Sequence, residues 1–212
     1  MTDRLKPLRI GDLEIKVPII QGGMGVRVST ASLAAAVAEC GAAGTIASVG
    51  LAYGIDERGR EFVEASNEAL QNEIRQARKL TKGVVGVNIM VALSNYEEMV
   101  RTAAKEGADF IVSGAGMPLS LPEFIKPYKV NLIPIISSPR GAELIIKTWK
   151  RRYDRLPDAI VVEGPMAGGH LGFRYEDLKS NTATCLEDLV AGALEIVKAY
   201  ETEFGASIPV IP

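Results

Sequence analysis

The chain has 212 residues, 47% of them hydrophobic, and its 24 Lys and Arg nearly balance 26 Asp and Glu to give a formal charge of -2. This composition supports a full hydrophobic core and excludes the charge imbalance of a disordered segment. Because there is no net basic field, we expect no nucleic-acid partner and no anionic membrane partner. No run approaches the ~20 apolar residues of a membrane span, and residues 1–12 lack a signal-peptide pattern.

The cysteine and histidine content restricts the chemistry further. Cys40 and Cys185 lie far apart and outside any CxxC spacing, which argues against a disulfide framework and a zinc site. A reducing cytoplasm is the expected location. His170 is the single histidine, so HExxH and every multi-histidine metal site are excluded, and neither a GxSxG elbow nor a GxxxxGK[ST] loop occurs. We therefore expect no metal site.

Short runs of β-branched residues recur along the chain between turn residues. They predict strands buried on both faces at 17–20, 44–48, 84–90, 110–113, 132–136, 159–162 and 208–211. Between several of these runs, apolar residues recur at helical spacing, and they predict helices that pack on a parallel sheet. The clearest examples are Tyr96, Met99, Val100, Ala103 and Ala104, then Ala142, Ile145, Ile146 and Trp149, and then Leu186, Leu189, Val190, Ala193 and Val197.

The alternation of strands and helices predicts an α/β fold with right-handed crossovers. Both an open doubly wound sheet and a closed barrel satisfy this order. Glycine and small polar residues gather after the expected strands, at 22–25, 113–116, 137–138 and 164–169, which favours a TIM (β/α)8 barrel. Because such a barrel usually needs ~250 residues, we expect residues 1–212 to form one incomplete barrel domain of six βα units and the start of strand seven. The long connection at 170–184 is a candidate lid.

Two polar features follow expected strands. At 21–25, Gln-Gly-Gly-Met-Gly lets backbone amides approach a flat or anionic ligand, but a dinucleotide fingerprint would need a further glycine and an acidic residue that are missing. A tight turn with no ligand fits this segment equally well. Asn88 ends the third expected strand and offers both a donor and an acceptor to a ring edge. A turn cap is the more frequent role of such a residue, so Asn88 permits a ligand without requiring one.

The most informative segment is 163–172, Glu-Gly-Pro-Met-Ala-Gly-Gly-His-Leu-Gly, where a buried strand opens into a glycine-rich turn. A lone histidine in a loop is usually a surface residue. Here the flanking glycines and the position at a strand's carboxyl end reverse that preference, because such a turn can hold an imidazole over a bound ring. His170 is therefore the candidate reaction centre.

Three segments in combination resemble the nitronate monooxygenases, formerly called 2-nitropropane dioxygenases. They are Pro-Ile-Ile-Gln-Gly-Gly-Met-Gly at 18–25, Gly-Val-Asn at 86–88 and Ala-Gly-Gly-His-Leu-Gly at 167–172. Flavin-dependent enoyl-ACP reductases carry the same motifs, and the likeness runs from about residue 7 to the end of the chain. It implies a barrel that holds FMN non-covalently, with His170 as the catalytic residue. The FMN-binding residues implied by the resemblance are Gly22, Gly23, Met24, Asn88, Glu163, Gly168 and Gly169.

The sequence also departs from the family pattern. Glu163 stands where many relatives carry glutamine, and Met166 where many carry glutamate, so the hydrogen bonds at the pyrimidine end of the flavin are expected to differ. The family's phosphate-binding glycines follow strands seven and eight, beyond Pro212. A chain without them lacks the main anchor for the FMN phosphate.

The resemblance implies that FMN-dependent oxidation of an alkyl nitronate by molecular oxygen yields a carbonyl compound and nitrite. His170 would hydrogen-bond the nitro group or remove an α-proton. Two alternatives remain open from the sequence. One is a reductase in which NADH or NADPH reduces FMN, which then reduces an enoyl-ACP thioester. The other is an inactive partial barrel whose sheet edge at 208–211 favours a homodimer or aggregation.

Overall fold

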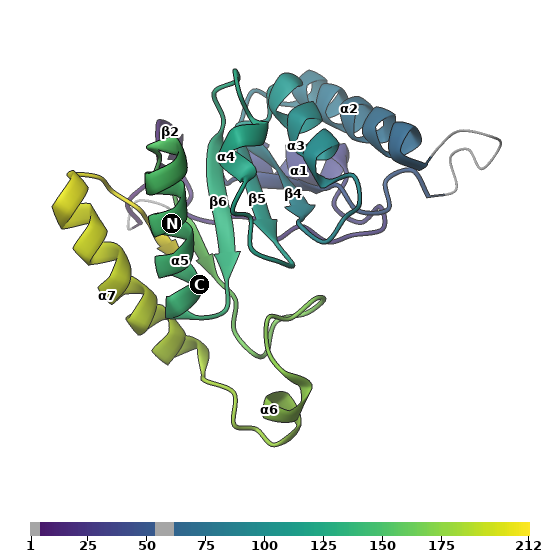
Figure 1. The fold of residues 1–212 in the computed structure, drawn as a ribbon. Coiled ribbons are helices and arrows are strands. Elements are labelled where there is room, and N and C mark those ends of the chain that lie inside the picture. The colour runs from purple at the N-terminus through teal and green to yellow at the C-terminus, as the bar shows by residue number, and fades with distance from the viewer. Residues whose placement is uncertain (1–4, 54–61) are drawn as a thin grey trace.

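A computed structural model describes residues 5–53 and 62–212. Its centre is a six-stranded parallel sheet in which each strand lies beside its neighbours in the sequence (Figure 1). Ile20 adds one parallel bridge to Ala43, just before the first strand of this sheet. The strands, in order across the sheet, are β3 (Gly44–Ala47), β4 (Val85–Met90), β5 (Phe110–Gly114), β6 (Asn131–Ile136), β7 (Ile160–Val162) and β8 (Val210–Ile211).

Helices connect the strands and contribute their apolar faces to one large core. They are α1 (Ala31–Glu39), α2 (Phe62–Leu80), α3 (Tyr96–Lys105), α4 (Leu121–Phe124), α5 (Pro139–Tyr153), α6 (Tyr175–Lys179) and α7 (Leu186–Phe204). In Figure 1, α5 and α7 lie together at one end of the sheet, whereas α6 stands away from it. Within the described parts of the chain, no helix is both long enough and apolar enough to cross a membrane.

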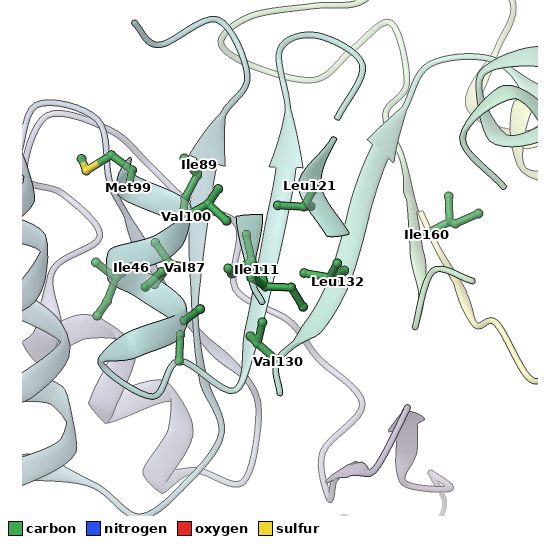
Figure 2. Packing of buried hydrophobic residues seen from close by; sticks show 14 of the residues in the cluster. Ile46, Val87, Ile89, Met99, Val100, Ile111, Leu121, Val130, Leu132 and Ile160 are labelled. Carbon is green, nitrogen blue, oxygen red and sulfur yellow. The ribbon is translucent and has the colours of Figure 1, made fainter. Parts of the chain in front are cut away.

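The side chains of the sheet alternate between two faces. The ladder pairs Ile46 with Val87, Val87 with Ile111 and Ile111 with Leu132, so these four form one row across β3 to β6. All four are fully buried beneath the helices, and Val100 of α3 lies in the same cluster (Figure 2). At ~25 cal/mol per Å² of apolar surface removed from water, this layer supplies most of the driving force that holds the helices on the sheet.

The opposite face of the sheet carries a second, smaller core. A two-stranded antiparallel hairpin, β1 (Leu8–Ile10) and β2 (Leu13–Ile15), packs there through the buried residues Ile10 and Ile15 against Phe110 at the start of β5. The sequence analysis did not predict this hairpin. The hairpin covers this second face at the amino-terminal ends of the strands. The carboxyl ends of the strands therefore remain available for a site.

The strand order excludes one of the two architectures left open above. A doubly wound sheet reverses its strand order at a switch point, and the described sheet has no reversal. The pairing does not close the sheet either, because no described ladder joins β8 to the segment at Ile20.

The expected first strand, 17–20, is the weakest part of the prediction. It pairs with Ala43 through only two backbone hydrogen bonds, from Gln21 N and to Ile19 O, both 3.0 Å long. Pro18 lacks the N–H that a longer ladder would need. The expected count of six complete βα units therefore stays a prediction.

Candidate active site

A cavity of about 760 Å³ opens at the carboxyl ends of the strands. The loop after Ile20, the ends of β3, β4 and β5, and the turn after β7 all contribute to its walls. Of the residues expected to bind cofactor or react, the cavity brings together Gly22, Gly23, Asn88, Glu163, Gly168, Gly169 and His170. Met24 is the exception, because it does not line the cavity and its side chain is 46% exposed. The roles of these residues remain predictions, but their convergence is a property of the fold.

The first loop is held in place by a buried polar cluster. The Gln21 side-chain amide donates to Ser29 Oγ at 2.8 Å and to the Thr45 carbonyl at 3.1 Å, while its oxygen accepts from Thr45 N at 3.3 Å. The fully buried Ser29 hydroxyl also accepts from Met24 N at 3.0 Å. The side-chain amide of Gln21 therefore holds the loop against β3, a role that the sequence analysis missed.

Gly23 and Asn88, which both line the cavity, lie in direct contact with each other. A Cβ added to Gly23 would meet Asn88 Cβ at 2.5 Å, so only glycine fits there without displacing the loop, whereas Gly22 has nothing within 4 Å of an added Cβ. Val87 and Ile89 are fully buried on the opposite side of β4, so strand alternation turns Asn88 toward the cavity. Asn88 does not cap a turn in this structure.

Two polar side chains of the cavity have no partner among the described residues. Thr45 is 1% exposed and lines the cavity, and its Oγ1 makes no hydrogen bond. The Asn88 side-chain amide likewise makes no hydrogen bond to any described part of the protein. An unpaired buried polar group costs about 1–3 kcal/mol, so the buried Thr45 hydroxyl favours a hydrogen bond to a ligand, and the half-buried Asn88 amide is free to make one. An added Cβ on Gly168 or Gly169 meets open space, which leaves room for a flat ring.

The turn that carries His170 is fastened at Gly172. Gly172 N donates to Glu163 Oε2 at 3.1 Å, and Ser137 Oγ donates to Gly172 O at 3.1 Å. A Cβ on Gly172 would lie 2.1 Å from Ser137 Oγ, so this close approach requires glycine. His170 itself is exposed and makes no hydrogen bond within the described chain. Ser137 belongs to the small polar pair noted after the strand at 132–136, yet nothing local distinguished its role.

The nitronate monooxygenase family model matches residues 6–212. The chain belongs to this family. Among solved structures, FabK from Thermotoga maritima is similar at 21% identity and a TM-score of 0.63, over 92% of this chain and 57% of that one. A nitroalkane oxidase from Streptomyces ansochromogenes is similar at 20% identity and a TM-score of 0.67, over 91% and 57%. At these identities the likeness shows the fold alone, and the chain spans less than two thirds of either structure. A search of curated proteins finds no match.

Family membership helps to interpret which chemistry the side chains of the cavity can support. Among the described residues that line it, Glu163 and His170 are the only ionisable side chains. One carboxylate and one imidazole can hold or move a proton, but they do not accept an electron pair from a substrate. The described residues contain no cluster of three or more His, Cys, Asp or Glu side chains that could hold a metal ion. A redox reaction in this cavity needs a cofactor, and the unpartnered atoms of Thr45 and Asn88 fit the polar edge of a flavin ring.

Proposed function

We propose that this chain belongs to an FMN-dependent oxidoreductase that oxidises an alkyl nitronate with molecular oxygen to a carbonyl compound and nitrite. One observation carries the proposal. The unpartnered side chains of Thr45 and Asn88 share a cavity with His170, in a chain that belongs to the nitronate monooxygenase family.

Several residues would hold FMN in this cavity. The Asn88 amide and the Thr45 hydroxyl would bond polar edge atoms of the ring, and Gly22, Gly168 and Gly169 would let the ring approach the backbone. When bound, FMN supplies the electron acceptance and the reaction with oxygen. Met24, which the sequence also suggested as a cofactor residue, would hold the shape of the loop rather than bind the ring, because it does not line the cavity and its backbone N–H and carbonyl are both bonded to Ser29.

His170 would bind and orient the substrate at the cavity wall. A neutral imidazole offers one N–H donor to a nitro oxygen and one acceptor nitrogen to an α-proton. With a nitronate only the donor is needed, and with a neutral nitroalkane the acceptor would remove the proton. The lid proposed at 170–184 begins at this residue, and its helix α6 has no buried side chain, which is consistent with a segment that opens.

The decisive experiment starts with the flavin. The chain would be purified from riboflavin-supplied cells, and its visible spectrum recorded after gel filtration with and without added FMN. Flavin bands that co-elute with the protein support the proposal, and a protein that stays colourless even with excess FMN contradicts it for this chain. Sedimentation of the same sample checks the predicted homodimer.

Turnover separates the proposal from the reductase alternative. With the flavin-loaded protein, oxygen consumption and nitrite release on adding a nitronate are the expected result. Bleaching of the flavin by NADH or NADPH without oxygen, together with no reaction on nitronate, would instead identify a reductase. Neither measurement depends on knowing the physiological substrate.

A further inference from the structure

Glu163 is the one acidic side chain among the described residues that line the cavity, and no Lys or Arg side chain accompanies it there. We propose that the negative charge of Glu163 lowers the reduction potential of the bound flavin. Glu163 would then tune the redox reaction in addition to shaping the turn that carries His170. The inference rests on the proposed function and adds what controls electron transfer at the same site.

The Glu163 carboxylate is held in place without being neutralised. Its Oε2 accepts from the backbone N–H of Gly172 at 3.1 Å, and Oε1 has no hydrogen-bond partner in the described parts of the chain. His170, the other ionisable side chain of the lining, makes no hydrogen bond to it. A backbone N–H fixes the position of a carboxylate but carries no full positive charge. The cavity wall therefore holds a fixed negative charge beside the space that a flavin ring would fill.

Reduction adds negative charge to the ring. When the ring takes up two electrons and one proton from a reductant, it gains one negative charge, and a fixed carboxylate nearby disfavours that gain. Two unit charges ~10 Å apart, at an effective dielectric constant of about 20, change such an equilibrium on the order of tenfold. Because Glu163 is only half-buried, dissolved salt should weaken the effect.

The direction of this effect suits the proposed reaction. A lower reduction potential makes the transfer of electrons from the reduced ring to molecular oxygen more favourable. It makes the uptake of electrons from a substrate or from a nicotinamide cofactor less favourable by the same factor. The charge of Glu163 therefore favours the half of the reaction that consumes oxygen.

Three substitutions separate the charge of Glu163 from its hydrogen bond. Glu163→Gln removes the charge but keeps an acceptor oxygen for Gly172 N, whereas Glu163→Asp keeps the charge on a shorter side chain. Glu195→Gln is the control, because it removes the same charge from an exposed position of α7 outside the cavity. The reduction potential of bound FMN is measured from its visible spectrum during anaerobic titration with dithionite beside a reference dye, at mildly alkaline pH and low salt.

We expect Glu163→Gln to raise the ratio of reduced to oxidised FMN about tenfold at the same dye potential, which corresponds to about 30 mV for a two-electron couple. Glu163→Asp and Glu195→Gln should stay close to the native value. An unchanged potential in Glu163→Gln, an equal rise in Glu163→Asp, or loss of FMN binding in Glu163→Gln would overturn the inference while the proposed function stands. If the native chain binds no FMN, the proposed function fails and this inference fails with it.

Discussion

Glu163 Oε2 accepts a hydrogen bond from the backbone N–H of Gly172, nine residues along the chain, at 3.1 Å. Ser137 holds the carbonyl of the same glycine, so both polar backbone atoms of Gly172 are fastened. His170 lies two residues earlier, on the wall of the cavity. The position of the His170 imidazole therefore depends on the contact made by the Glu163 carboxylate. The family resemblance implied only a flavin-binding role for Glu163.

Removing this carboxylate is expected to loosen the turn. A hydrogen bond to a charged group contributes about 1.5–3 kcal/mol when shielded, so in Glu163→Ala the Gly172 amide should exchange its hydrogen roughly tenfold faster, as measured by NMR. Glu163→Gln keeps an acceptor oxygen and is the matched control, with exchange close to that of the native chain. Equal exchange in all three proteins would show that the bond does not restrain the turn.

Two neighbouring glycines are expected to respond very differently to alanine. In Gly23→Ala the new methyl would overlap Asn88, so we expect a loss of about 1–3 kcal/mol in the free energy of unfolding. In Gly22→Ala the methyl meets nothing within 4 Å, and stability should stay within ~0.5 kcal/mol of native. Chemical denaturation of both variants measures this difference. Equal stabilities would contradict the close approach of the first loop to Asn88.

Glu106 is expected to make stability depend on pH. Its carboxylate accepts from Arg75 Nε and Gln71 Nε2, both at 2.6 Å, which ties α2 to the end of α3. The Arg75 hydrogen bond holds the pKa of Glu106 below its ordinary value of about 4.3. A lowered pKa in the folded state means that the stabilisation is present above pH ~4.3 and is lost as the pH falls through the folded pKa.

The matching experiment compares Glu106→Gln with the native chain by denaturation at several pH values. We expect a deficit of about 1–2 kcal/mol at pH 7 that shrinks below pH ~4. Glu97→Gln is the control, because Glu97 pairs with Arg101 on the exposed side of α3 and should cost under ~0.5 kcal/mol. A deficit that stays constant down to pH 2 would exclude the proposed ionic origin.

His170 is expected to affect turnover but not flavin binding. Proton transfer and hydrogen bonding by a positioned side chain typically contribute 10²- to 10⁴-fold to rate, so in the flavin-loaded protein His170→Ala should lose at least about 10²-fold in kcat. Its flavin spectrum should match the native one, because the residues proposed to hold the ring are unchanged. Unchanged steady-state rates would remove His170 from the mechanism.

Much of the sheet could be predicted from the sequence because buried strands are marked by short runs of β-branched residues. The β-branched runs at 84–90, 110–113 and 132–136 all form strands, with ends within one residue of the prediction. The hairpin β1–β2 has no such signature, since each strand has three residues. Contacts distant in sequence stabilise it, including the packing of Ile10 near Phe110 and the bond from Asn131 Nδ2 to Asp12 at 3.1 Å.

The sequence by itself determined the α/β class, the family motifs and the glycine-rich loops that surround the cavity. These follow from hydrophobic periodicity and from the backbone freedom of glycine, both of which act locally. Only the tertiary structure decided that Thr45 has an unpartnered hydroxyl in the cavity, that Met24 does not line it and that Ser137 fastens Gly172. Each of these depends on which distant backbone lies within hydrogen-bonding distance, and no local pattern encodes that.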